Sequence, residues 1–115
     1  MSEETIFSKI IRGEIPCDKV YETDEVLAFR DINPAAPVHV LVIPKRSIVH
    51  VGQAHQDDAL LLGKLMLAAK EVARLEGLEE SGFRLVINNG AEVGQTVFHL
   101  HVHVLGGRAF SWPPG

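Results

Sequence analysis

Residues 97–105 constrain the fold more than any other stretch, because apolar residues and histidines alternate without a break from Phe98 to Val104. In a β-strand, residues two apart share one face, so His99, His101 and His103 are predicted to point the same way. The opposite face is apolar and suited to a core: Phe98, Leu100, Val102 and Val104. A half-buried strand with incidental histidines explains the alternation. It does not explain three imidazoles in a row, since each ring nitrogen needs a partner. The row therefore predicts a reactive face.

The rest of the chain predicts a small antiparallel α+β domain with one short and one long helix. The helices are expected at 2–12 and 57–76, ended by Gly13 and Gly77, with Asp57 or Asp58 at the start of the long one. Strands are expected in a hairpin over 18–30 and at 38–43 and 83–87. The long helix carries two neighbouring apolar stripes. They predict either a deeply buried helix or one that also packs against a partner protomer.

Length and composition indicate one domain over residues 1–115 and exclude several functions. The formal net charge of −4 disfavours nucleic acid as the main partner. A lone cysteine, Cys17, cannot form an intrachain disulfide, which favours a reducing, cytoplasmic compartment. No apolar run approaches the ~20 residues of a membrane span, so no membrane association is expected.

Two kinds of chemistry fit the histidine face, and the first is metal binding. Zinc in catalytic sites commonly takes three protein ligands, and alternate histidines supply two of them. The first and third histidines would lie roughly 13 Å apart along a strand, too far to share one ion comfortably. Carboxylates that would orient ligating imidazoles are not evident. We therefore expect no metal and no other cofactor.

The second kind of chemistry is covalent catalysis at phosphorus, with His101 as the nucleophile. Such a site needs a ring held in one tautomer, donors for the phosphoryl oxygens and a proton source for the leaving group. The glycine-punctuated loop 90–96 offers backbone N–H groups, and Thr96 adds a hydroxyl. Asn88 and Gln95 add amides. His39, on the strand at 38–43, is a fourth imidazole, expected either beside the histidine row or in a structural role.

Residues 99–105 resemble the histidine triad motif, in which apolar residues separate three histidines and two more apolar residues follow. The resemblance covers nearly the whole chain in order. It extends to residues 6–16, 28–32, 39–45, 94–98, 106–108 and 112–115, which are similar to the Hint branch of the histidine triad (HIT) superfamily. The chain is therefore identified as a member of that superfamily, of the type known as histidine triad nucleotide-binding proteins.

The resemblance implies a HIT-like sheet continued across a homodimer and hydrolysis of purine nucleoside 5′-phosphoramidates, including lysyl adenylate-like substrates. An amine would leave, a nucleoside monophosphate such as AMP or GMP would be released, and no metal would be required. His101 would become nucleotidylated, with His99, His103 and His39 beside it. Asp31 would hold the ribose, and Trp112 would reach the partner's leaving-group side. The implied nucleotide contacts are Phe7, Ile10, Phe29, Ile32, Leu41, Asn88, Gly94, Gln95, Thr96, Val97 and His103.

Two residues depart from the family pattern. Thr96 stands where serine is common, which keeps the hydroxyl and adds a methyl group, and Ser111 stands where relatives can carry histidine. Two alternatives stay open. One is a purine nucleotide-binding or scaffold protein with vestigial catalysis. The other is a diadenosine polyphosphate hydrolase of the Fhit-like branch, against which the Hint-like N-terminus and tail argue.

Overall fold

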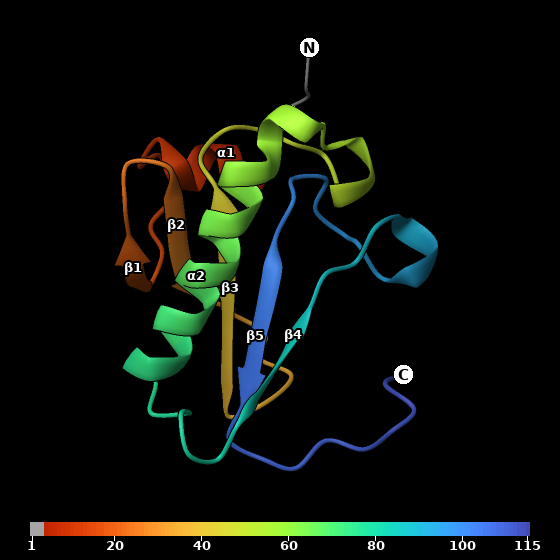
Figure 1. Cartoon of the computed structure of the whole chain (residues 1–115). Coiled ribbons are helices and arrows are strands. Elements are labelled where there is room, and N and C mark those ends of the chain that lie inside the picture. The colour runs from red at the N-terminus through yellow and green to blue at the C-terminus, as the bar shows by residue number, and fades with distance from the viewer. Residues whose placement is uncertain (1–3) are drawn as a thin grey trace.

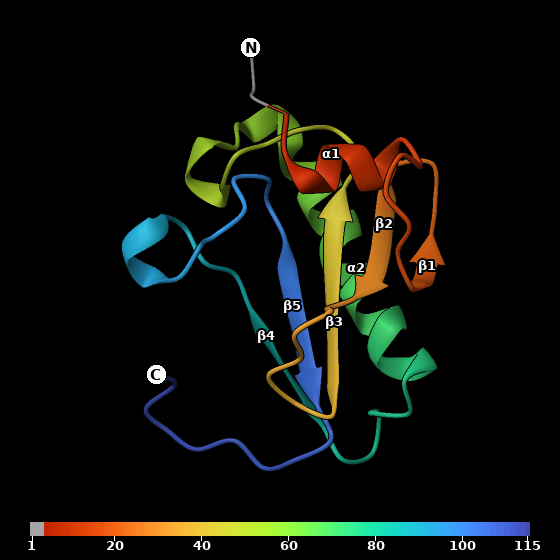
Figure 2. The same cartoon turned by 180° about the vertical axis from the view of Figure 1, so that it is seen from behind.

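The computed structural model describes residues 4–115, which form a five-stranded antiparallel sheet with a helix on each face (Figures 1 and 2). The strand order is β1-β2-β3-β5-β4. The helices are α1 (Ile6–Ile11) and α2 (Ala59–Leu75). The strands are β1 (Lys19–Glu22), β2 (Val26–Arg30), β3 (Val38–Pro44), β4 (Phe83–Val86) and β5 (Val102–Gly106). The expected α+β architecture, with one short and one long helix, is confirmed.

Alternation along the central strands divides the core between the two faces of the sheet. Even-numbered residues of β2, β3 and β5, such as Val40 and Val102, pack beneath α2. Odd-numbered residues of β2 and β3, such as Phe29 and Leu41, pack with Phe7 of α1 on the other face. Because His103 pairs with Leu41 across β3 and β5, its side chain shares the α1 face. The fold therefore places the histidine face beneath α1.

Both helices are shorter than their apolar patterns predicted. Helix α1 begins after Thr5, whose hydroxyl accepts from the Ser8 N–H while the Ser8 hydroxyl accepts from the Thr5 N–H. This reciprocal pair of hydrogen bonds fixes the N-terminal end of the helix. Residues 2 and 3 of the predicted helix lie outside the described residues. Helix α2 begins after Asp58, as expected, although the Asp58 carboxylate accepts from the His55 N–H rather than from a helical one.

The two stripes of α2 differ in burial. The first is buried from Leu61 to Val72, but its last member, Leu75, is 45% exposed. In the second stripe, Ala69 and Ala73 are buried, whereas Met66 is 39% exposed. One stripe thus meets the sheet, and part of the second remains on the surface.

The predicted strand at 97–105 is wrong in its first half, since β5 begins at Val102. The carbonyls of Val97 and His99 accept from the side chains of Gln95 and His101. The Leu100 N–H donates to Ile48 at 2.6 Å. These bonds take the groups that a strand ladder would use. Phe98, predicted to be in the core, is consequently 45% exposed. In the described part of the chain, no helix is long and apolar enough to cross a membrane.

Candidate active site

A cavity of about 490 Å³ opens on the α1 face of the sheet. Its walls combine the apolar residues of α1, β2 and β3 with two of the histidines. Ten residues singled out in the sequence line it: Phe7, Ile10, Phe29, Asp31, Ile32, Leu41, Thr96, Val97, His101 and His103. The lining therefore combines apolar side chains with imidazoles, a carboxylate and a threonine. Such a combination suits a ligand with a flat apolar part and a charged part.

His101 lies just before β5 and is held in a single tautomer. Its Nδ1 lies 2.7 Å from the carbonyl oxygen of His99, so Nδ1 carries the hydrogen and donates it. Nε2 of the neutral ring is then left with a free lone pair. Phe7 packs edge-on against this ring, with the centroids 5.2 Å apart. The result is an imidazole of fixed orientation at the wall of the cavity, with a free lone pair on Nε2.

His39 and His103 form a hydrogen-bonded pair. A backbone N–H determines which of their ring nitrogens carry hydrogens. The Ala35 N–H donates to Nδ1 of His39 at 3.0 Å, so that nitrogen must be an acceptor. Nε2 of His39 therefore carries the hydrogen and donates it to Nδ1 of His103 at 2.8 Å. In a neutral His103 the remaining hydrogen sits on Nε2, which is buried and has no partner within the described protein. His103 is thus available as a hydrogen-bond donor to a bound group.

The four histidines near the cavity, His39, His99, His101 and His103, are held in their neutral form. Burial is the main cause that lowers the pKa of His39, His99 and His101. Burial, reinforced by His101 and His39, lowers the pKa of His103 to about 4. His101 and its neighbours are therefore neutral at physiological pH, the form in which an imidazole has a lone pair to offer.

The Asp31 carboxylate, His39 and His103 also form a cluster that resembles a metal site in composition. One ligand atom from each lies within 4.8 Å of the others. However, Nε2 of His39 carries a hydrogen because Nδ1 accepts from Ala35. A cation could bind there only after displacing that hydrogen, since a metal takes the lone pair of a neutral imidazole. The donor set therefore does not fit a metal ion as it is built.

Asp31 of this cluster also lines the cavity. Its Oδ1 accepts from the Asn33 N–H at 2.8 Å, and its Oδ2 lies 3.5 Å from Nε2 of His39. Both oxygens retain capacity for further donors. Asp31 follows β2 directly, so its position is fixed by the sheet.

Several predicted residues do not line the cavity: His39, Asn88, Gly94, Gln95, His99 and Trp112. His99 is only 1% exposed and donates from Nε2 to the Pro44 carbonyl at 2.7 Å, which ties the segment before β5 to the end of β3. Trp112 is 80% exposed on the C-terminal tail. His39 does not line the cavity itself but contacts two residues that do, His103 and Asp31.

The expectation that Gln95 contacts the phosphate through its side-chain amide has to be corrected. Its Nε2 donates to the carbonyls of Val49 and Val97, and its Oε1 accepts from the Gly90 N–H at 2.8 Å. The Gly94 and Gln95 N–H groups also donate within the loop, to Ala91 and Gly90. Gln95 therefore fastens the loop rather than offering free donors. From the region 90–97, only Thr96 and Val97 reach the cavity.

Five residues that line the cavity were not predicted: Ile6, Pro16, Cys17, Asp18 and Arg30. The guanidinium of Arg30 binds Asp18 at 3.1 Å and Glu76 at 2.8 Å. In the sequence, Ile6, Pro16 and Arg30 lie within the stretches 6–16 and 28–32 that carry the family resemblance, and Cys17 and Asp18 directly follow the first of them.

Fold and site together define a small α+β protein with a cavity lined by histidines, a carboxylate and apolar side chains. Comparison with known proteins agrees. The HIT domain family matches residues 12–110. An uncharacterized HIT-like protein of Synechocystis sp. is 65% identical over 115 residues, 100% of both chains.

Solved structures give the same result. A HIT family hydrolase from Legionella pneumophila superposes with a TM-score of 0.94 at 48% identity, covering 97% of this chain and 100% of the other. A histidine triad nucleotide-binding protein from Candida albicans superposes with a TM-score of 0.82 at 32% identity, covering 97% and 85%. The chain belongs to the HIT domain family, and its fold is that of HIT family hydrolases.

Proposed function

We propose that this protein hydrolyses the P–N bond of purine nucleoside 5′-phosphoramidates through a covalent nucleotide on His101. The observation that carries the proposal is the fixed tautomer of His101, whose Nδ1–H is bound to the His99 carbonyl at the wall of the cavity. This bond leaves Nε2 free to attack. The resemblance of the chain to the Hint branch favours phosphoramidates over other nucleotide esters.

The reaction would proceed in two balanced steps. In the first, Nε2 of His101 attacks phosphorus, a new P–N bond forms, and the bond from phosphorus to the amine breaks. The departing nitrogen takes one proton, supplied by solvent. In the second, water attacks phosphorus, the bond to His101 breaks, and the proton of the water returns to solvent. The products are a nucleoside monophosphate and the free amine, including lysine-type amines.

His103 and Thr96 would stabilise the phosphoryl group during both steps. His103 Nε2–H is a buried donor without a partner among residues 4–115, and Thr96 lines the same cavity. A donor that already points toward the charge developing on the phosphoryl group needs no reorganisation during the reaction, so no free energy is spent on it. His39 would keep His103 in this tautomer through their 2.8 Å hydrogen bond.

The apolar lining of the cavity suits a purine nucleoside. Phe7 and Phe29 meet edge to face with centroids 5.4 Å apart and are both buried. A planar base such as adenine or guanine would pack in the apolar part of the cavity, against these rings and against Leu41. Asp31 would accept hydrogen bonds from both ribose hydroxyls, which a carboxylate can do at once.

We further propose a homodimer in which the sheets of two protomers join through β4. This strand forms one edge of the sheet and exposes 40% of Phe83. Paired edges would satisfy the free backbone groups of β4 and cover this apolar surface. Trp112, 80% exposed on the tail, would contact the partner's leaving-group side. The lone Cys17 favours a reducing, cytoplasmic setting.

The proposal is tested by turnover and binding together. Purified protein is incubated with an adenosine 5′-phosphoramidate of a primary amine, and AMP and amine are quantified by chromatography. We expect equal amounts of both products, and none with His101→Ala. AMP binding without turnover would instead support the nucleotide-binding or scaffold alternative. Faster cleavage of a diadenosine polyphosphate than of the phosphoramidate would support the Fhit-like alternative.

A further inference from the structure

We propose that Arg108, which lies outside the cavity, is a positioning residue that holds His103 in the tautomer presenting Nε2–H to the cavity. It would act at a distance, through Ala35 and His39. The catalytic meaning of this role rests on the proposed function, because His103 would donate to the phosphoryl group. The tautomer itself can be measured without any substrate, so the two ideas can fail separately.

The contacts form one continuous series from the tail to the cavity. Nη2 of Arg108 donates to the Ala35 carbonyl at 3.1 Å. The Ala35 N–H donates to Nδ1 of His39 at 3.0 Å. His39 in turn donates from Nε2 to Nδ1 of His103 at 2.8 Å. Ala35 is thus held on one side by Arg108 and holds the histidine pair on the other.

The loop that carries Ala35 has few other restraints of this kind. It spans residues 31–37 between β2 and β3 and contains two prolines, which cannot donate hydrogen bonds. The tail packs on it directly at Gly107, where a Cβ atom would lie 2.8 Å from Cβ of Pro37. Gly107 also has φ +89°, a conformation that side chains disfavour. The start of the tail and this loop are therefore fitted to each other.

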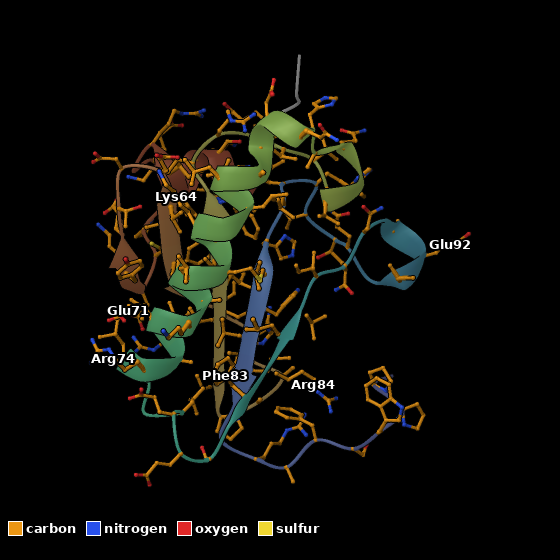
Figure 3. All side chains as sticks on the ribbon, viewed as in Figure 1. Lys64, Glu71, Arg74, Phe83, Arg84 and Glu92 are labelled. Atoms are coloured by element: carbon orange, nitrogen blue, oxygen red, sulfur yellow. The ribbon has the colours of Figure 1, made fainter. Side chains whose placement is uncertain are left out.

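Arg108 is itself oriented by the tail. Its guanidinium carbon lies 4.3 Å from the ring centroid of Phe110, and Nη1 donates to the Ala109 carbonyl at 3.1 Å. Arg84 of β4 lies against the same ring, 5.1 Å from its centroid, and donates to the Ser111 carbonyl at 3.1 Å. Arg84 therefore shares the tail with Arg108 but makes no hydrogen bond to Ala35. Figure 3 shows Arg84 extending from β4 toward the tail.

Loosening Ala35 would change which hydrogens the histidine pair carries. Without the Ala35 N–H, Nδ1 of His39 can hold the hydrogen, and Nε2 then becomes an acceptor. His103 would donate from Nδ1 to His39 and would present a bare lone pair on Nε2. A lone pair repels a phosphoryl oxygen where an N–H attracts it, so the donor of the cavity would be lost.

The test measures tautomers by ¹⁵N NMR of histidine-labelled full-length protein, without ligand. The variants are Arg108→Met, which removes the donor to Ala35, and Arg84→Met, the matched control on the same aromatic ring. In the wild type we expect His103 protonated at Nε2 and not at Nδ1. Arg108→Met should give a measurable population of the opposite tautomer in His39 and His103, and Arg84→Met should not. Unchanged tautomers in Arg108→Met, or the same shift in Arg84→Met, would overturn the proposal.

Kinetics provide a second measurement on the same proteins. Losing a neutral hydrogen bond is worth on the order of threefold to tenfold. We expect Arg108→Met to lower kcat for phosphoramidate hydrolysis by that factor with KM unchanged, and Arg108→Lys to recover part of the loss. A change confined to KM would place Arg108 in binding and contradict the proposal. If no phosphoramidate is hydrolysed at all, the proposed function fails, and the NMR comparison still decides the role of Arg108.

Discussion

Acidification should destabilise this protein because the folded state keeps His103 neutral. The pKa of His103 is lowered from 6.5 to about 4, mainly by burial. The unfolded chain therefore binds more protons than the folded chain between these two values, and the free energy of unfolding falls as pH falls. Above pH 6.5 this effect vanishes. Between pH 7 and pH 5, His103 alone should remove about 2 kcal/mol.

Urea unfolding at pH 7, 6 and 5, at constant ionic strength, measures this loss. His103→Gln is the matched variant, because a glutamine oxygen can still accept from Nε2 of His39 but cannot be protonated in this range. The other buried histidines remain in both proteins, so the difference in slope isolates His103. The variant should lose about 2 kcal/mol less than the wild type on going to pH 5. Equal losses would refute the inference that His103 is held neutral by its surroundings.

Three further predictions concern ligands, metal and the tail. Asp31→Asn should weaken binding of AMP more than that of 2′,3′-dideoxy-AMP in calorimetric titrations; equal weakening would place the ribose elsewhere. Full hydrolytic activity should persist after exhaustive EDTA treatment, because Nε2 of His39 carries a hydrogen; loss with EDTA and recovery with zinc would show a metal requirement. Deleting residues 112–115 should change which amines are released fastest without changing purine or ribose preference, and heterodimers with an intact-tailed His101→Ala protomer should restore the original amine preference. Failure of that restoration, or sedimentation as a monomer at micromolar concentration, would contradict a tail acting on the partner.

The alternating patterns predicted the sheet well where both faces of a strand are covered. Residues 38–43 became β3 because Val40 and Val42 meet α2 while Leu41 and Ile43 meet the core on the α1 side. The same periodicity failed at 97–101. There Gln95 and His101 occupy the carbonyls of Val97 and His99, so the segment is not paired as a strand. Alternation indicates which side chains are apolar, but not which backbone groups are already bonded.

In the candidate site, too, some features could be predicted from the sequence and others could not. Strand alternation accounts for His103, which lies on β5 opposite Leu41 of β3, but not for His99 and His101, which precede the strand. The donor that sets the tautomers of His39 and His103, the Ala35 N–H, could not be predicted, since it depends on the path of a proline-containing loop. Gln95 was expected to offer a free amide, yet it is 2% exposed and holds the loop together. Sequence alone does not distinguish an amide that binds a ligand from one that binds backbone.

The most direct test of the central claim is mass spectrometry of the protein quenched within its first turnovers on a purine nucleoside phosphoramidate. We predict one added nucleoside monophosphate, located on the peptide that contains His101 and absent from His101→Ala. The adduct should appear before product accumulates and should disappear when substrate is exhausted, since water completes the second step. Turnover by His101→Ala near the wild-type rate, or an adduct on another residue, would contradict a covalent mechanism at His101.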